Sequence, residues 1–493
     1  MATSVRLWRG EATERRSRQV LTVVVVLITL ALSYYLGRRP TMRYVQILIG
    51  LVALAVLVWR PQLGLAAILL SGSLLHFAIG TGTLTQINMA YLLVPVLSAV
   101  WLGAMLVRRS FQLVPSRANA PAIGLVLITT LAFIYGNLPL QAFAQHAPLR
   151  SQIGGWGLIV FSAAALLLVG NQVKDIRWLK LLVWLFLPIA TVYFVGHGIR
   201  GAGRLERLFP IGATDSMFWL WYAALSAGLL LFHPRQNFFV RLYLLLCVGL
   251  AIFVSYRPQQ ISWASGWLPI TVVMGMLVLL RWPRLAVVVG MLGTLTIALN
   301  FELLRSFALS GDNQYSLLTR TAAAQVVSQI ISTNPLLGVG PANYYWYTPL
   351  YSLLGYYIRF NSHNQYVDIL AQTGLLGLAC FLWLVAEIAG IGLRLRRALP
   401  PGFERAYACA GVAGVVGMLA TGMLGDWVLP FVYNIGVNGF RSSVVGWMFL
   451  GGLIAVEGLR RRSAPAAEPA PGPAAPDTRL ALPTHPGAAR HGG

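Results

Sequence analysis

Long apolar runs recur along nearly the whole chain, and they limit it to a fold that crosses a membrane many times. A bilayer core is spanned by about 20 apolar residues in a helix, because every main-chain polar group in lipid must be paired within its own segment. Several of the early runs are short, so we expect about 12 spans and at most about 14. The candidate spans lie near 20–36, 44–59, 63–79, 89–107, 121–137, 156–170, 178–196, 216–232, 239–255, 267–281, 284–300, 366–393, 405–424 and 442–459.

The composition supports an all-α polytopic membrane protein, since only 10% of the 493 residues are charged, whereas soluble domains carry about 25%. The 37 Lys and Arg against 14 Asp and Glu give a formal net charge of +23. Basic residues concentrate in the cytoplasmic loops of membrane proteins, so we expect no nucleic-acid partner. With the N-terminus inside, 12 arginines fall outside and need another explanation: Arg38, Arg39, Arg43, Arg150, Arg200, Arg204, Arg207, Arg257, Arg305, Arg320, Arg359 and Arg441.

One segment interrupts the rhythm of short loops, because it is long and contains no run able to span. A loop of this length is usually functional. It contains a helix-like stretch from Arg320 to Thr333, then a turn, then a cluster of aromatic residues from Tyr344 to Tyr357. We therefore divide the chain into N-terminal transmembrane helices, a large outer loop with short helices, C-terminal transmembrane helices and a disordered cytoplasmic tail, over 1–300, 301–363, 364–462 and 463–493.

His363 is the first candidate for chemistry, since it ends the outer loop and precedes a very apolar helix. Ser362 and Asn364 beside it are both suitable helix caps. A neutral imidazole at the membrane surface can accept a proton from a substrate hydroxyl near pH 7. The alternative interpretation is an interfacial histidine that only caps the helix.

The outer arginines indicate a site for an anionic substrate. A guanidinium grips phosphate oxygens through two hydrogen bonds and keeps its charge at any working pH. Outer carboxylates are scarce and the histidines lack metal-site spacing, so we expect neither a metal nor another cofactor. For Arg38, Arg39 and Arg43 we prefer contact with lipid phosphates. The candidates for binding a substrate phosphate or diphosphate are Arg257 after a span, Arg320 in the loop helix, and Arg200, Arg204 and Arg207 in a glycine-rich loop.

Asp368 lies about one turn into the helix after His363, and an ionisable group in a span usually has a role. We expect Asp368 either to pair with an arginine or to orient the site. The sequence assigns no role to Glu387 or Asp426.

Three segments together resemble the O-antigen ligase and O-antigen polymerase superfamily: Asn334-Pro-Leu-Leu-Gly-Val-Gly-Pro-Ala-Asn343, Ser362-His-Asn-Gln-Tyr366 and Ala371-Gln-Thr-Gly-Leu-Leu-Gly377. The resemblance implies a bacterial inner-membrane glycosyltransferase with about 12 spans, cytoplasmic termini and one large periplasmic loop. It implies that the essential loop histidine is His363 and that two arginines of the family are Arg320 and Arg257. Arg257 departs from the family pattern because Pro258 follows it, and Ala342 stands where the family usually has glycine.

The resemblance further implies a ligase that transfers a polysaccharide from undecaprenyl diphosphate to a sugar of lipid A–core, with membrane lipids around it. In this mechanism arginines stabilise the leaving diphosphate, His363 deprotonates the acceptor hydroxyl, the linkage inverts, and loop tyrosines stack on sugar rings. A polymerase or a protein O-oligosaccharyltransferase of the same superfamily needs similar groups. We prefer the ligase because no additional domain for a protein acceptor is visible. A lipid-linked glycan transporter is a more distant alternative. Such a fold predicts inverted repeats and mid-span charges, whereas this sequence has few mid-span charges and no clear internal repeat.

Overall fold

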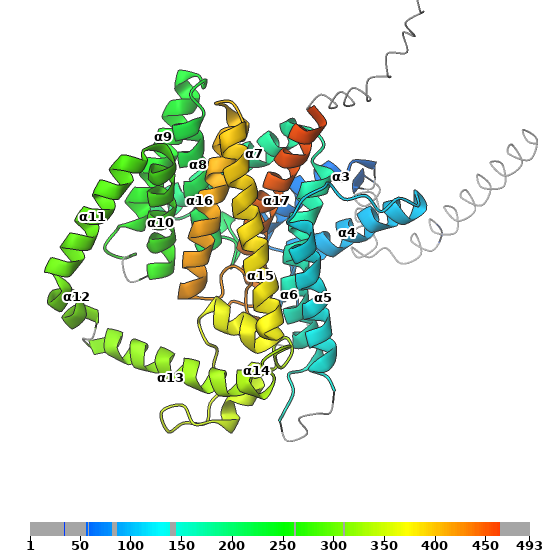
Figure 1. Cartoon of the computed structure of the whole chain (residues 1–493), viewed down its shortest axis with the longest axis vertical. Helices are drawn as coiled ribbons and strands as arrows, with labels where there is room; N and C mark the ends of the chain where they lie inside the picture. The colour runs from blue at the N-terminus through cyan, green and yellow to red at the C-terminus, as the bar shows by residue number, and fades with distance from the viewer. Residues whose placement is uncertain are drawn as a thin grey trace, which may run out of the picture.

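The computed structural model describes residues 34, 56–57, 59–80, 86–138, 144–260, 263–308 and 311–463, and most of them are helical (Figure 1). The predicted spans over 20–36 and 44–59 lie almost entirely outside the described residues. So do Arg38, Arg39 and Arg43 and nearly all of the predicted tail.

The elements follow one another as helices joined by short connections, with a single small antiparallel hairpin in the described part of the chain. The first half comprises α3 (Pro61–Leu74), β1 (Ala78–Gly80), β2 (Gln86–Asn88), α4 (Met89–Val107), α5 (Asn119–Tyr135), α6 (Leu149–Gln172), α7 (Ile176–Gly198), η2 (Glu206–Leu208) and α8 (Ser216–Phe232). The second half comprises α9 (Phe238–Ser255), α10 (Ala264–Arg281), α11 (Pro283–Leu299), α12 (Phe301–Ala308), α13 (Gly311–Thr333), α14 (Tyr344–Tyr347), η3 (Thr348–Leu350), α15 (Gln365–Ala398), α16 (Phe403–Leu424), η4 (Val437–Gly439) and α17 (Phe440–Ser463).

Eight of the described helices are long and apolar enough to cross a membrane, and four shorter apolar helices accompany them. The prediction of a mostly helical chain that fits a multi-pass membrane protein is therefore confirmed. The predicted count of about 12 spans stays a prediction.

α8 and α17 form the centre of the bundle, since almost every side chain along them is buried. A helix that is apolar on all sides must be surrounded by other helices, and α17 packs on α6 and α8, while α16 packs on α8, α10 and α15. Glycines allow the close approach: a Cβ at Gly451 of α17 would lie 2.3 Å from the carbonyl oxygen of Leu166 in α6.

Arg441, predicted to lie among the outer arginines, is instead buried at the start of α17, with 2% of its surface exposed. Its guanidinium donates to the carbonyl oxygens of Leu75 (2.7 Å) and Phe77 (2.8 Å), at the carboxyl end of α3. The last carbonyls of a helix have no partner within the helix, so a cation there can donate hydrogen bonds to them. The cation also interacts favourably with the negative end of the helix dipole. Arg441 thus joins α17 to α3 and is not available to a substrate.

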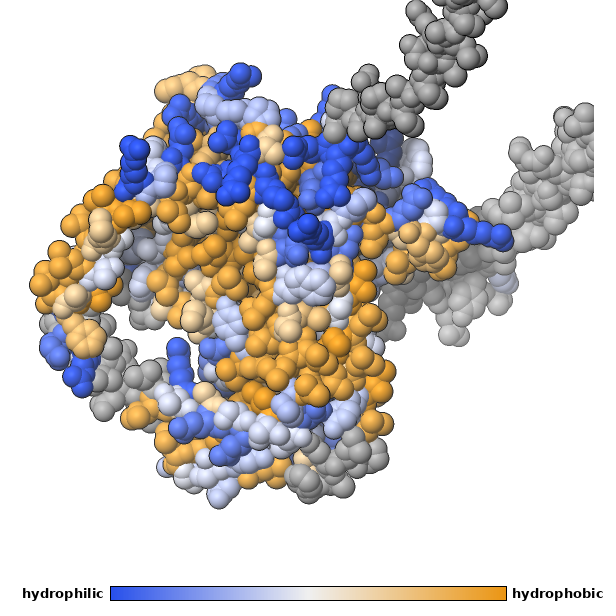
Figure 2. Space-filling view, viewed as in Figure 1, coloured by the Kyte–Doolittle hydropathy of each residue, from blue (hydrophilic) through white to orange (hydrophobic). Residues whose placement is uncertain are grey.

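An apolar belt separates two polar ends of the bundle (Figure 2). One end carries the arginines in the last turns of α10, α15 and α17: Arg281, Arg396, Arg397, Arg460, Arg461 and Arg462. The opposite end carries α13 and α14, with α13 lying across the bundle and packed on α15 (Figure 1). The predicted outer loop is therefore found at the end of the molecule away from these arginines.

The segment 301–363 is more helical than predicted. The helix expected from Arg320 to Thr333 begins at Gly311, so α13 has 23 residues. The polar sequence before Arg320 is typical of a loop, yet it contains no proline to stop a helix, and α13 gains packing on α15.

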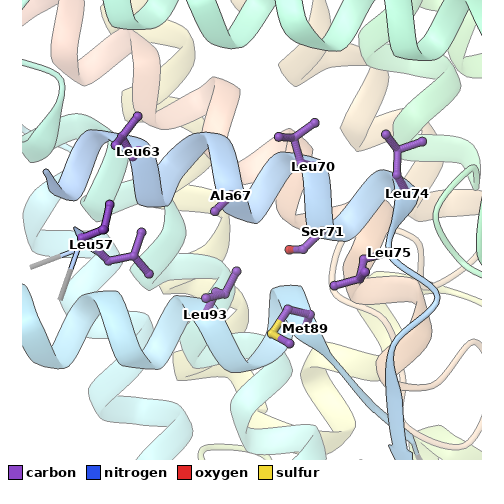
Figure 3. A pocket seen from close by; sticks show the side chains of 10 residues that line it. Leu57, Leu63, Ala67, Leu70, Ser71, Leu74, Leu75, Met89 and Leu93 are labelled. Carbon is purple, nitrogen blue, oxygen red and sulfur yellow. The ribbon is translucent and has the colours of Figure 1, made fainter. Parts of the chain in front are cut away.

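An apolar pocket of about 640 Å³ lies between α3 and α4 (Figure 3). Leucines dominate its lining, and Ser71 is its one polar side chain. Since no charged side chain is among the described residues that line it, this pocket is a poor candidate for binding an anionic substrate.

Candidate active site

The loop segment 334–343 is joined to α15 at a break in that helix. Gly374 has φ 66° and ψ −169°, so the helix is interrupted one third of the way along its length. In an unbroken helix the amide of Leu375 would donate to the carbonyl of Ala371, but here both groups have partners in the loop. Three main-chain hydrogen bonds result: Val339 N to Ala371 O (2.9 Å), Leu375 N to Pro335 O (2.8 Å) and Leu376 N to Leu336 O (3.2 Å).

A side-chain amide strengthens this connection. Asn343 Nδ2 donates to the carbonyl of Gly136 (3.1 Å) at the end of α5, and Asn343 Oδ1 accepts from Ala147 N (3.0 Å). Gln372 of α15 accepts from Ala342 N (3.2 Å). The first and third segments of the predicted family signature are therefore in direct contact, and together they fix the base of the loop that ends at His363.

His363 lies immediately before the cap of α15. Asn364 Oδ1 accepts from Tyr366 N (3.0 Å) and Val367 N (3.3 Å), so Asn364 is the N-cap, as predicted. His363 itself has φ 50°, a left-handed conformation uncommon for a residue other than glycine. Its side chain is partly exposed and makes no hydrogen bond within the described residues. The capping alternative for His363 is wrong, because Asn364 performs that role.

The electrostatic surroundings keep the imidazole neutral. Partial burial lowers the pKa of His363 below its usual value, and the positive charge of Arg320 lowers it further. Arg320 is exposed on α13, which crosses the end of the bundle beside the start of α15. The structure therefore brings two of the predicted site residues into electrostatic range and leaves the histidine able to accept a proton near pH 7.

Arg257 belongs to a second group of polar residues. Its guanidinium donates to the carbonyl oxygen of His197 (2.9 Å) at the end of α7. Nε2 of His197 lies 2.6 Å from Nε2 of Gln260, and Nδ1 of His197 lies 2.9 Å from Oε1 of Glu206. His197 had no role in the sequence interpretation, and its position nine residues before Glu206 offered no recognisable pattern.

Arg200 and Arg204 lie in the loop between His197 and Glu206, and both side chains are exposed. They therefore share one end of α7 with Arg257. Among the residues that the structure describes, no hydrogen bond or ion pair joins this arginine group to His363 or Arg320. The predicted constellation is thus present as two groups, with His363 and Arg320 in one and Arg257, Arg200 and Arg204 in the other.

Two buried carboxylates, Asp215 and Asp426, lie within electrostatic range of each other. Asp215 ends the arginine loop, and burial raises its pKa to about 7, with a further contribution from the charge of Asp426. Burial also raises the pKa of Asp426 to about 6, although it accepts hydrogen bonds from Phe431 N (2.6 Å) and Asn434 Nδ2 (2.5 Å). The charge of Asp426 also contributes to raising the pKa of Tyr344, which lies in the loop before His363. In the described part of the chain, no group of three or more His, Cys, Asp or Glu residues could hold a metal ion.

Asp368 orders the residues around His363. It is fully buried, and its Oδ1 accepts from the hydroxyls of Tyr344 (2.5 Å) and Ser362 (2.7 Å). The amide of Ser362 in turn donates to the Tyr344 hydroxyl (3.3 Å). Of the two alternatives for Asp368, pairing with an arginine is wrong, because its partners are hydroxyls that hold the residue preceding His363.

Aromatic rings of the loop pack mostly on the protein itself. Tyr344 is buried and stacks on Phe431 with ring centroids 4.7 Å apart. The guanidinium of Arg359 lies 3.6 Å from the ring centroid of Trp346, a cation–π contact. Tyr344 and Trp346 are therefore not free to stack on a sugar, which limits the predicted stacking by loop tyrosines to other rings. The exposed rings of the loop are Tyr356 and Tyr357, at 69% and 67%.

Residues 209–382 match the family model described as O-antigen ligase. This match supports membership of the O-antigen ligase superfamily. No curated protein matches the chain. The family match includes Arg257, Arg320 and His363, whereas Arg200 and Arg204 precede it. Members of the O-antigen ligase superfamily are glycosyltransferase-like enzymes of the ligase or polymerase type that use lipid-linked glycans.

Proposed function

We propose that the chain is a lipopolysaccharide O-antigen ligase of the bacterial inner membrane. It would take a polysaccharide from undecaprenyl diphosphate and join it to a sugar hydroxyl of lipid A–core on the periplasmic face. The observation that carries the proposal is a neutral, exposed His363 beside the charge of Arg320, on a loop held to α15 through the family's signature segments. A base without a fixed partner next to a phosphate-binding cation suits transfer from a glycosyl diphosphate.

The residues divide the work of an inverting displacement. The acceptor hydroxyl attacks the anomeric carbon of the donor and loses its proton to Nδ1 or Nε2 of His363. The bond between that carbon and the phosphate oxygen breaks, and its electron pair leaves with the diphosphate. Arg320, with Arg257, Arg200 and Arg204 on the diphosphate, stabilises the negative charge that develops on the leaving group. Attack from the face opposite the leaving group inverts the linkage.

The position of α13 supports a role in closing the site. The charge of Arg320 acts on His363 from a helix that crosses the end of the bundle, so α13 and the start of α15 would form the two sides of a substrate site. The second arginine group would hold the distal phosphate once a donor bridges the two groups. A bound donor would then contact both groups, which no hydrogen bond or ion pair joins within the described residues.

In vitro transfer tests the proposal directly. Purified full-length chain is incubated with an undecaprenyl diphosphate glycan and lipid A–core in the presence of a chelator, and the products are resolved by mass. We expect lipopolysaccharide of higher mass, lost in His363→Ala and strongly reduced in Arg320→Ala. His76→Ala and Arg305→Ala serve as matched controls, since both side chains are exposed and lie outside the two groups.

Other products would contradict the ligase. Longer glycans on the lipid donor itself would mean a polymerase, and glycan on an added acceptor protein would mean a protein O-oligosaccharyltransferase. Movement of donor across a vesicle membrane with no transfer would mean a transporter. Full activity of His363→Ala would remove the histidine from the mechanism even if the ligase reaction were observed.

A further inference from the structure

A pocket lies at the end of the bundle away from His363, where α8 ends, α9 begins and α10 ends. Its volume is about 440 Å³, and most of its lining is apolar: Leu230, Leu231, Phe238, Leu242, Leu245 and Trp282. Arg241 and Arg281 are the two charged side chains in the lining. An apolar pocket with two guanidinium groups at its edge suits an amphiphile with an anionic head.

No carboxylate among the described residues neutralises the positive charge of this pocket. Within the described residues, neither Arg241 nor Arg281 forms an ion pair, and no carboxylate lines the pocket. Arg281 lies 5.7 Å from the ring centroid of Trp282, and Arg396 donates to the carbonyl of Leu280 (2.6 Å) close by. A third cation is therefore adjacent, and Trp282 belongs to a residue type that is enriched at membrane surfaces.

The pocket continues along α9 as a second apolar hollow of about 460 Å³. The two share Leu242 and Leu245, and the second extends over Leu246, Gly249, Leu250 and Phe253. A Cβ at Gly249 would have no atom within 4 Å, so this glycine leaves an open notch in the helix face. The surface therefore offers a cationic head site joined to an apolar track that follows the helix into the membrane.

We propose that this groove binds an anionic phospholipid. Its headgroup phosphate lies between Arg241 and Arg281, and an acyl chain lies along α9 over the notch at Gly249. The charge selects the anionic class, because two unneutralised guanidiniums attract a net negative headgroup and gain less from a zwitterionic one. The apolar track selects a lipid over free phosphate, since phosphate alone would leave it unfilled. By the positive-inside rule, this end of the bundle faces the cytoplasm, where anionic lipids are available.

Binding of defined lipids tests the site. The purified full-length chain in detergent is titrated with phosphatidylglycerol and, separately, with phosphatidylcholine of the same chains, and bound lipid is counted by native mass spectrometry. We expect roughly 10- to 30-fold preference for phosphatidylglycerol. Arg241→Gln combined with Arg281→Gln removes that preference, while Arg284→Gln, an exposed arginine outside the lining, keeps it.

The acyl track is tested by filling the notch. Gly249→Leu adds a side chain where the protein has open space, so the fold is kept and binding of phosphatidylglycerol weakens severalfold. Gly275→Leu on α10 also meets open space and should leave binding unchanged. Equal affinity for both lipids in the wild type, or unchanged preference in the double arginine variant, would overturn the proposal. Competition by millimolar inorganic phosphate without any effect of Gly249→Leu would show a phosphate site and overturn it too.

The outcome is independent of the proposed enzyme activity. Binding is measured without donor or acceptor, and His363→Ala should bind phosphatidylglycerol as the wild type does. Both lipid-site variants should elute from a sizing column as the wild type does, which separates loss of the site from loss of the fold.

Discussion

Replacing Gly374 by alanine should separate the signature loop from α15. A Cβ at this position would lie 2.2 Å from the carbonyl oxygen of Leu336 and 2.5 Å from Leu337 N, which are main-chain atoms that cannot rotate away. The positive φ of 66° costs an alanine about 1–2 kcal/mol by itself. If the loop moves enough to break two of its three hydrogen bonds to α15, a further loss of about 2 kcal/mol follows. We therefore expect Gly374→Ala to lower the free energy of unfolding by about 3–4 kcal/mol.

The measurement is unfolding of the purified chain by titration of SDS into mixed micelles, followed by tryptophan fluorescence. Gly390→Ala in the same helix is the matched control, because its Cβ would meet only the end of the flexible Arg394 side chain at 3.2 Å. An alanine in a regular helix is favoured over glycine by up to about 1 kcal/mol, so this control should be as stable as the wild type or slightly more. A Gly374→Ala protein within about 1 kcal/mol of Gly390→Ala would refute the argument that the break positions the loop.

Four further predictions concern the charged residues. Because burial and Arg320 lower the pKa of His363, transfer should decline only below about pH 6.5, and a rate already falling from pH 8 to pH 7 would contradict the base role. Asp368→Leu should reduce kcat about tenfold or more with KM little changed, because the Tyr344 and Ser362 hydroxyls lose their acceptor. Asp368→Asn retains an acceptor for the two hydroxyls, so its loss of kcat should be smaller. Equal kinetics for the two variants would argue against a positioning role. Burial raises the pKa of Asp215 to about 7, so the native state binds more protons than the unfolded chain between about pH 4 and pH 7. The free energy of unfolding should therefore fall as the pH rises through that range. In unfolding measured at pH 5 and pH 8, Asp215→Asn should remove this fall. Arg441→Met should lower the free energy of unfolding by about 3 kcal/mol, since it leaves buried carbonyls at the end of α3 unpaired; a change under about 1 kcal/mol would mean that α3 is held by other contacts.

The helical, multi-pass character was predictable from local sequence. In lipid, an apolar stretch must pair its own main-chain groups, so it becomes a helix whatever its neighbours are. For that reason the expected spans near 405–424 and 442–459 coincide closely with α16 and α17. The cap at Asn364 was equally readable, because capping depends only on a side chain and the two amides that follow it.

The candidate site depended on contacts between distant residues. Asp368 accepts from a tyrosine 24 positions earlier, and Arg441 donates to carbonyls more than 360 positions earlier. Nothing in the residues around either group indicates such partners, so the sequence left Asp368 either to pair with an arginine or to orient the site, and it placed Arg441 among the outer arginines. The sequence by itself determined that the chain is helical, and it only predicted which residues could bind phosphate and which histidine could accept a proton. The tertiary structure alone decided which of these meet, because a buried polar group takes whichever partner the packing of the helices brings within hydrogen-bond distance.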